Sequence, residues 1–159
     1  MWISAQAYSA LERLSGHHRI TKREMIELLV VTALITVRVS QINGCRFCID
    51  INSAVLAKRT GSMNKVEALE RWQESELFDN KEMVVLEYVE AVTYTDRQVD
   101  DDLSQRLHEY FNEDEIVELT GLIAFQNLSS KFNSALDLPA QGFCRLPESA
   151  DRNNEKSNV

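Results

Sequence analysis

The 159-residue chain contains only five glycines and two prolines. Because these residues most often interrupt regular structure, their scarcity disfavours a sandwich of short strands and favours long helices. Hydrophobic residues make up 44% of the chain, and its length suits one domain with a core of its own. The sequence therefore predicts a single all-α domain.

Positive charge is also scarce, since 17 lysines and arginines stand against 25 aspartates and glutamates, giving a net charge of −8. Without a basic patch, nucleic acid is not an expected partner. The most apolar run, residues 28–37, is too short to cross a bilayer. The first residues lack the basic and apolar pattern of a secretion signal. These absences predict a cytoplasmic protein with no membrane partner.

Apolar residues recur at helical spacing along most of the chain. The middle of the second predicted helix is apolar on nearly every face, which predicts a buried central helix, although its many β-branched residues leave a strand as the alternative. We expect residues 1–147 to form the domain and the polar residues 148–159 to be a disordered tail. The seven expected helices cover residues 5–14, 21–41 (capped by Thr21), 45–61, 62 or 64 to beyond 72 (capped by Ser62 or Asn64), 81–95, 100–111 and 112–136 (capped by Asn112, with Glu115 completing a capping box).

Two of the three cysteines form a Cys-x-x-Cys pair, Cys45 and Cys48, just after the helix break at Asn43-Gly44. At the start of a helix their sulfurs share a face, and the positive end of the helix dipole favours a thiolate. The second thiol can attack a mixed disulfide or sulfenic acid formed on the first. Arg46 is expected to favour the thiolate and Asp50 to oppose it. In a reducing cytoplasm this spacing predicts a redox-active pair.

Two other interpretations of the pair remain open. The first is a zinc site, which needs four ligands, but the chain has no second Cys-x-x-Cys and no His-x-x-x-His. The second is two small buried side chains without chemistry. We expect no metal and no cofactor. We also expect the histidines to lie on the surface and the third cysteine to be a free thiol. The ligands that zinc would have to draw on are Cys45, Cys48, Cys144 and one of His17, His18 and His108.

The stretch RVSQINGCRFCIDINSAVLAKRTG closely resembles the signature of the alkylhydroperoxidase D-like / carboxymuconolactone decarboxylase family. The stretches AYSALERLSG and YFNEDEIVELTGLIAFQNLSSKFNSALDLP and the Trp72-Gln73 loop are also similar, so the resemblance covers residues 7–143. It implies a helical bundle assembled as trimers or hexamers. In peroxidase-type members it implies that Cys48 attacks a small hydroperoxide, that Cys45 resolves the sulfenic acid, and that an external dithiol restores the pair.

The sequence departs from the family pattern at the proton relay. The family histidine four residues after the second cysteine is Asn52 here, and the family glutamate twelve residues before the first cysteine is Ala33. Asn52 shares the cysteine face but cannot titrate near neutral pH. Glu27 lies on a different helix face and is a poor substitute. Residues 129–131, Ser-Ser-Lys, stand where the family often has Trp-Asn-Arg.

Three hypotheses about function follow. The first is a thiol-dependent peroxidase or disulfide oxidoreductase in antioxidant defence, weakened by the incomplete relay, in which Asn52 positions or solvates the thiolate. Ser40 or Gln41 could form hydrogen bonds in its pocket. The second is a family member with a degenerate site that acts as a non-catalytic or redox-sensor oligomer. The third is a carboxymuconolactone decarboxylase, which the intact cysteine pair disfavours.

Overall fold

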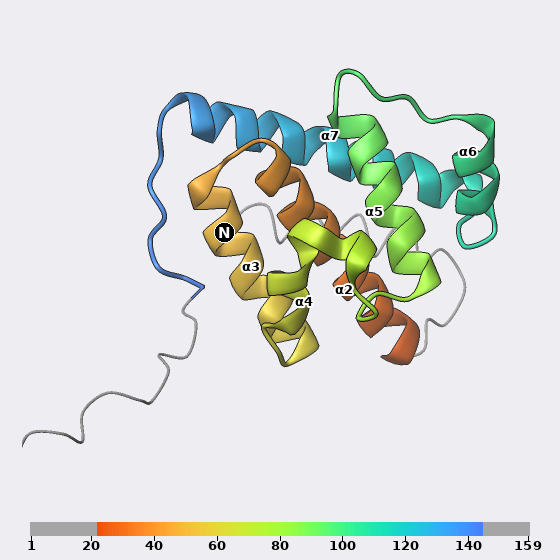
Figure 1. Cartoon of the computed structure of the whole chain (residues 1–159), viewed down its shortest axis with the longest axis horizontal. Helices are drawn as coiled ribbons and strands as arrows, with labels where there is room; N and C mark the ends of the chain where they lie inside the picture. Colours follow the sequence, from red (N-terminus) through yellow and green to blue (C-terminus); the bar gives the residue numbers. More distant parts are fainter. Residues whose placement is uncertain (1–21, 145–159) are drawn as a thin grey trace, which may run out of the picture.

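The structure, a computed structural model, describes residues 22–144 (Figure 1). The first predicted helix, the Thr21 cap, His17 and His18, and the predicted tail at 148–159 lie outside the described residues. Within them every regular element is helical, so the all-α prediction is confirmed and the strand alternative for the second element is wrong. The elements are α2 (Lys22–Ile42), α3 (Arg46–Thr60), α4 (Asn64–Ala68), the 3-10 helix η1 (Leu69–Glu74), α5 (Asn80–Thr93), α6 (Asp101–His108) and α7 (Glu113–Ala135).

Helix α2 is the centre of the fold and packs against α3, α5 and α7. From Val31 to Ser40 every residue except Thr36 is buried, as the apolar pattern predicted. The segment Glu24–Ile42 has a mean hydropathy of 1.8 and is long enough to suit a membrane span as well. This segment is longer than the ten-residue apolar run at 28–37 on which the sequence-based expectation rested. The helices packed around α2 account for that apolar composition, because a core helix of this kind is apolar all round.

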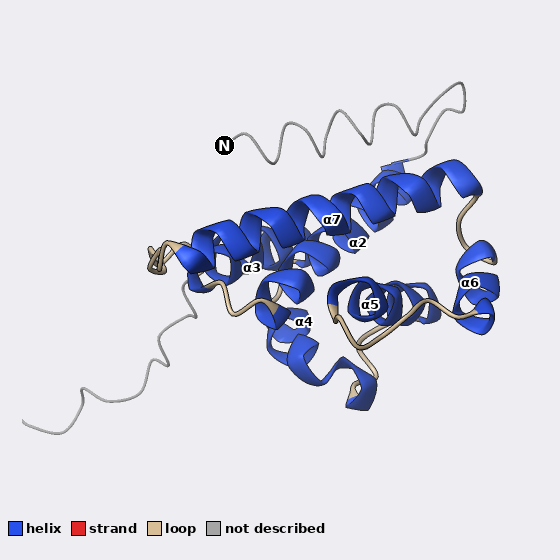
Figure 2. Ribbon diagram, turned by 90° about the horizontal axis from the view of Figure 1, so that it is seen from above, coloured by secondary structure: helices blue, strands red, loops and turns tan. Residues whose placement is uncertain are grey.

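Two apolar clusters flank α2 and fix the helices that carry the candidate site. One lies between α2, α5, α6 and α7, and the other between α2, α3, η1 and α5. Figure 2 shows α7 running lengthwise while α5 is seen nearly end-on, so these two helices cross steeply. Helix α2 is thereby held from several sides, and its C-terminal end, which leads into the cysteine pair, has a fixed position.

Helix starts follow local sequence signals where a polar cap is present. Asn112 caps α7 and forms the predicted capping box with Glu115. Asp79 and Glu82 form a second box, so α5 begins at Asn80, just before the predicted start, and ends at Thr93. Helix α6 stops at His108, three residues early, and the exposed His108 ring bonds only the Ser104 carbonyl among the described residues.

The fourth predicted helix is wrong in one respect, because it is not continuous. It divides into α4 and η1, with a non-helical backbone at Arg71 (φ −123°, ψ 43°). Its N-cap is Met63, which gives no side-chain cap, rather than Ser62 or Asn64. After the kink the Trp72 indole N–H donates a hydrogen bond to a buried carboxylate on α5.

That carboxylate, Glu90, is the centre of a buried polar network. Its Oε1 accepts hydrogen bonds from Arg38 Nε (2.9 Å), Arg38 Nη2 (2.5 Å) and Trp72 Nε1 (2.9 Å), and its Oε2 accepts one from Arg97 Nη1 (2.5 Å). Burial alone would raise the pKa of Glu90, but the bonds from Trp72, Arg38 and Arg97 together lower it. The network ties α2, η1, α5 and the loop after α5 together.

Candidate redox site

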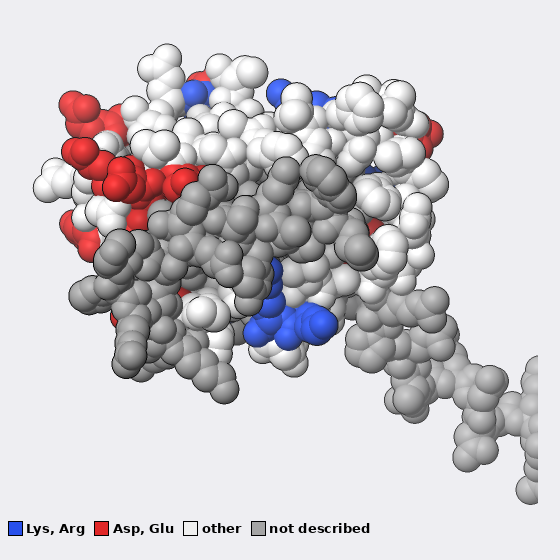
Figure 3. All heavy atoms as spheres, turned by 180° about the vertical axis from the view of Figure 1, so that it is seen from behind, with Lys and Arg blue, Asp and Glu red and all other residues white. Residues whose placement is uncertain are grey.

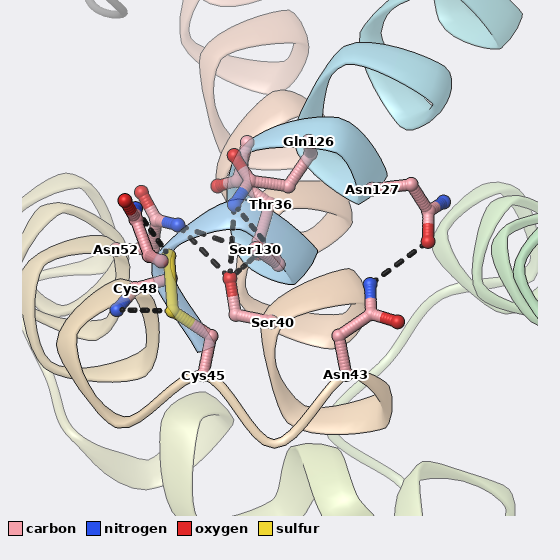
Figure 4. Close-up of a disulfide and its surroundings, with 10 residues drawn as sticks. Thr36, Ser40, Asn43, Cys45, Cys48, Asn52, Gln126, Asn127 and Ser130 are labelled. Atoms are coloured by element: carbon pink, nitrogen blue, oxygen red, sulfur yellow. Dashed lines mark hydrogen bonds between the residues drawn. A yellow bond between two sulfur atoms is a disulfide. The ribbon is translucent and has the colours of Figure 1, made fainter. Parts of the chain in front are cut away.

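The turn between α2 and α3 places the first cysteine at a helix start. Gly44 has a φ of +62°, in the left-handed region that glycine adopts without strain, and this ends α2 as the Asn43-Gly44 pair predicted. The Asn43 side-chain amide donates to Asn127 Oδ1 of α7 at 2.8 Å, which anchors the turn (Figure 4). Cys45 is the N-cap of α3, and its sulfur accepts the backbone N–H of Cys48 at 3.2 Å.

The two sulfurs of the pair meet in a disulfide, with the Cα atoms of Cys45 and Cys48 5.2 Å apart. The two residues are only 1% and 3% exposed. No group of three or more His, Cys, Asp or Glu side chains among residues 22–144 is arranged to hold a metal ion. The geometry therefore supports thiol–disulfide chemistry at this position, inside the protein rather than on its surface.

A neutral polar network lies against the pair (Figure 4). Its centre is the Ser40 hydroxyl, which donates to the Thr36 carbonyl (2.6 Å) and accepts from Asn52 Nδ2 and Gln126 Nε2, both at 3.1 Å. Gln126 Nε2 also donates to Ser130 Oγ at 3.0 Å. None of the four side chains in this network titrates near neutral pH, so the network can position neighbouring groups but cannot serve as a general base.

The predicted site residues are brought together only in part. Asn52 lies on the cysteine face as predicted, but the hydrogen bonds shown for its amide go to Ser40 Oγ and the Thr36 carbonyl of α2. A side-chain donor to the pair comes instead from Asn133 of α7, whose Nδ2 lies 3.3 Å from Cys48 Sγ. Ala33 is buried among apolar side chains. Of the two polar residues expected near the pair, Ser40 belongs to the polar network beside it. The Gln41 side chain instead accepts a hydrogen bond from Arg38.

Sequence reasoning missed the contribution of α7. Gln126, Ser130 and Asn133 all face the pair or its polar network, although they are some 80 residues away in the chain. Their spacing of four and three residues puts them on one helix face, which is the signal that could have identified them. That this face of α7 lies opposite the cysteine pair could not be predicted from the spacing, because it depends on how α7 packs on α2.

Arg46 and Asp50 do not act on the pair as expected, and both instead hold the segment after α7. Each is two residues from Cys48, on the far side of α3. Arg46 forms an exposed ion pair with Asp137 (2.5 Å). The buried Asp50 carboxylate accepts the backbone N–H groups of Gln141 (2.8 Å), Phe143 (3.0 Å) and Cys144 (2.8 Å).

These backbone bonds set the charge state of Asp50. Burial would raise its pKa, but the bonds from the backbone of residues 144, 143, 141 and 142 together lower it, so the carboxylate is ionised at neutral pH. The neighbouring Cys144 is a free thiol, as expected, with its sulfur 3.9 Å from Met63 Sδ. Burial and the Asp50 charge raise the pKa of the Cys144 thiol. This thiol is therefore a poor nucleophile.

Replacing Asp50 by asparagine is expected to loosen the segment 137–144. Bonds from backbone N–H groups to a charged acceptor contribute roughly 1.5–3 kcal/mol each, and an amide can replace them only in part. Hydrogen exchange should show faster exchange at the amides of residues 141, 143 and 144. The matched control is Asp137→Asn, which removes only the exposed pair with Arg46 and should change exchange little. If the amides of residues 141, 143 and 144 exchange as slowly in Asp50→Asn as in the unmodified protein, the Asp50 carboxylate does not hold this segment.

Comparison with known proteins places the chain in a family. The sequence profile of the Carboxymuconolactone decarboxylase family matches residues 29–91. The uncharacterized protein YnjA of Escherichia coli K12 is 49% identical over 119 residues, covering 75% of this chain and 65% of YnjA. The chain thus spans slightly less than two thirds of that relative. The uncharacterized protein YdfG of Bacillus subtilis 168 is 32% identical over 104 residues, covering 65% of this chain and 71% of YdfG.

Solved structures show the same fold. A protein of unknown function from Agrobacterium tumefaciens, provisionally named as the antioxidant defence protein AhpD, superposes with a TM-score of 0.65 at 27% identity, covering 86% of this chain and 90% of its own. The debrominase Bmp8 superposes with a TM-score of 0.65 at 19% identity, over 87% of this chain and 71% of its own, which shows the fold alone. The described helices and the Cys-x-x-Cys pair define an alkylhydroperoxidase D-like helical protein. The chain belongs to the alkylhydroperoxidase D-like / carboxymuconolactone decarboxylase family.

Proposed function

We propose that this protein is a cytoplasmic thiol-dependent oxidoreductase that reduces small hydroperoxides and contributes to antioxidant defence. The observation that supports this most strongly is the Cys45–Cys48 disulfide at the start of α3, with an N–H donor on each sulfur. The Agrobacterium relative, named provisionally for antioxidant defence, supports the same assignment. The intact pair also argues against a decarboxylase, whose chemistry needs no dithiol.

In the proposed cycle the Cys48 thiolate attacks the terminal oxygen of the hydroperoxide. The O–O bond breaks, Cys48 becomes a sulfenic acid, and the departing alkoxide takes a proton from solvent, which balances the proton released when the Cys48 thiolate formed. The Cys45 thiol then attacks the Cys48 sulfur, water leaves, and the disulfide forms. An external dithiol returns two electrons and two protons through a mixed disulfide and is itself oxidised. Cys45 is the resolving residue in this scheme, as the family resemblance implies.

The local donors suit these steps. Asn133 Nδ2, 3.3 Å from Cys48 Sγ, would hydrogen-bond a Cys48 thiolate, and the backbone N–H of Cys48 would do the same for Cys45. Because both cysteines are almost fully buried, the pair accepts a small peroxide more readily than a bulky one. Reduction by an external dithiol then requires a local opening of the first turn of α3 or the last turns of α7.

A second candidate is a redox sensor that oxidises once and does not turn over efficiently. The neutral network around Ser40 favours it, because Asn52 and Gln126 cannot take the proton that a catalytic base would remove. A turnover assay separates the two candidates. Sustained loss of hydroperoxide in the presence of excess dithiothreitol supports the enzyme, one equivalent of oxidation followed by arrest supports the sensor, and no oxidation of the pair contradicts both.

Asn52→His is expected to accelerate the reaction of the reduced pair with hydrogen peroxide at neutral pH. The imidazole would lie on the cysteine face next to Ser40 and could take a proton, and a positioned base contributes about 10²–10⁴ in rate. We expect an increase of roughly a hundredfold, the lower end of that range, and a new inflection near the ordinary histidine pKa of about 6.5. Stopped-flow measurement of thiol loss against pH tests this. The control is Asn52→Gln, which adds no base. Equal rates for both variants would show that Asn52 does not occupy a relay position.

A further inference from the structure

A cavity of about 350 Å³ lies at the end of α3 that is remote from the cysteine pair. Its walls come from the first half of α2, the last turn of α3, the first turn of α4 and the start of α5. Pockets that hold small organic ligands begin at about this volume. Arg59 lines the cavity from the last turn of α3, whereas Cys45 caps the start of that helix, so the two are about 20 Å apart along its axis. The cavity is therefore separate from the redox site.

The acidic residues at the start of α5 that line the cavity already have partners within the chain. The Glu82 carboxylate accepts hydrogen bonds from Lys65 Nζ with both oxygens, at 2.5 and 2.6 Å. The Asp79 carboxylate accepts the backbone N–H of Glu82 at 2.8 Å and caps α5. Glu27 of α2 also lines the cavity and adds a third negative charge. These acids disfavour a ligand that carries more than one negative charge.

The half-buried Arg59 is the cavity residue that suits an anion best. Its Nη1 donates to the Leu29 carbonyl and to Thr32 Oγ1 (2.9 Å), which fixes the guanidinium against α2. Within residues 22–144 no carboxylate forms an ion pair with it, and its Nε and Nη2 have no acceptor. This is the edge of the guanidinium with which Arg38 binds Glu90. Burial lowers the pKa of Arg59, but the group stays protonated at neutral pH.

The rest of the lining combines a second cation with an apolar wall. Lys81 lies with its Nζ 4.6 Å from the centre of the Phe111 ring and forms no ion pair with another described residue. The apolar wall is formed by Ile26, Val30 and Val31 of α2. The end of α3 is at the lower edge of the molecule in Figure 1, and Figure 3 shows a compact group of basic side chains at the same edge, apart from the acidic ones.

We propose that this cavity binds a small aliphatic monocarboxylate. The free edge of the Arg59 guanidinium donates two parallel hydrogen bonds to the carboxylate, and the hydrocarbon part packs on the wall of Ile26, Val30 and Val31. A phosphate group fits less well, because it brings a second negative charge next to Glu82 and Asp79 and has nothing to place on the apolar wall. This inference does not depend on the proposed redox function.

Titration of 4-methylpentanoate into the full ¹⁵N-labelled chain tests the site. We expect saturable shifts of the backbone amide signals of residues 26–31, 59–65 and 79–82, with a Kd of about 1 mM or tighter. Two compounds separate the contributions of charge and hydrocarbon. The alcohol 4-methylpentan-1-ol lacks the charge and inorganic phosphate lacks the hydrocarbon, so each should bind at least ~10-fold more weakly.

Three results of this titration would overturn the proposal. The first is the absence of saturable shifts up to about 10 mM 4-methylpentanoate. The second is a set of shifts confined to the amides of residues 45–52, which would place the ligand at the cysteine pair. The third is equal or tighter binding of either the alcohol or inorganic phosphate, which would show that the charge and the apolar wall do not act together.

Variants of neighbouring basic residues test the role of Arg59. Arg59→Gln should weaken binding at least ~10-fold, because it removes the charge and both free donors. Arg59→Lys should also weaken it, since an ammonium group cannot form the two parallel bonds. The matched control is Lys58→Gln, which removes an exposed charge from the same turn but outside the cavity lining and should change Kd less than ~2-fold. Equal effects of Lys58→Gln and Arg59→Gln would overturn the assignment.

A variant of the apolar wall keeps the test independent of the bonds from Arg59 to α2. Ile26 is 48% exposed, so Ile26→Glu should leave the fold intact, which circular dichroism checks. A carboxylate on the wall should weaken binding of 4-methylpentanoate at least ~10-fold, because it repels the ligand and removes its apolar contact. An unchanged Kd for Ile26→Glu would overturn the proposed position of the hydrocarbon part.

Discussion

Replacing Glu90 by alanine is expected to lower the free energy of unfolding by about 3–5 kcal/mol, the range for removing one partner of a buried ion pair. Glu90 is 2% exposed and Arg38 is 9% exposed. Without the carboxylate, the Arg38 guanidinium and the Trp72 N–H would lose their acceptor inside the protein. Urea unfolding of the two proteins followed by circular dichroism measures the difference.

The matched control is Glu87→Ala. Glu87 is on the same helix and also pairs with an arginine, Arg106, but both side chains are partly exposed. Its loss should change stability by no more than about 1 kcal/mol. Equal effects of the Glu90 and Glu87 substitutions would show that the buried network contributes nothing beyond a surface ion pair.

The contribution of Glu90 should also depend on pH. Its pKa in the folded protein is below the ordinary value of 4.5, because the bonds from Trp72, Arg38 and Arg97 outweigh the opposing effect of burial. The stabilisation is therefore fully present above pH 4.5 and is lost as the pH falls through the lower, folded-state pKa. The stability difference between wild type and Glu90→Ala should narrow in that acidic range and stay constant from pH 6 to pH 8.

Cys48→Ser is expected to reduce the rate of reaction with hydroperoxide by at least ~10³-fold, because it removes the proposed nucleophile. Cys45→Ser should leave the first step intact but prevent resolution, so that a sulfenic acid accumulates at Cys48 and a sulfenic-acid-specific reagent traps it. Mass spectrometry of the trapped protein distinguishes the two variants. Sulfenic acid at Cys45 in the Cys48→Ser protein would reverse the assigned roles.

Cys144→Ser is the control for this pair of variants. The Cys144 thiol lies beside Met63 and Asp50, and burial together with the Asp50 charge raises its pKa. It is therefore expected to react slowly and to contribute nothing to formation of the Cys45–Cys48 disulfide. A Cys144→Ser protein that no longer oxidises would show that the third cysteine takes part in the cycle.

Features that depend on neighbouring residues were predictable from the sequence. The Asn112 capping box, the break at Gly44 and the start of α3 at the cysteine pair each rest on three or four adjacent residues. The burial of α2 followed from its apolar residues alone. Placing Asn52 on the cysteine face needed only the helical repeat.

Features that depend on contacts between distant segments were not predictable. Glu90 and Arg38 are 52 residues apart, and a charged residue in a helix gives no sign by itself of whether it is buried. Asp50 was expected to affect the thiols, whereas it binds the backbone of residues 141–144, because its side chain leaves the far side of α3. The polar neighbours of the pair on α7 could be grouped by spacing, but their position opposite α2 required the tertiary packing.

The most direct test of the redox assignment is the rate at which the fully reduced protein loses two thiols to hydrogen peroxide and to an organic hydroperoxide at neutral pH. The account predicts that both thiols disappear faster than a free cysteine thiol reacts and that mass spectrometry finds a Cys45–Cys48 bridge. It also predicts a faster reaction with the smaller peroxide, because the pair is buried. A rate no greater than that of free cysteine would contradict it and would mean that this chain keeps the family fold without the peroxidase chemistry.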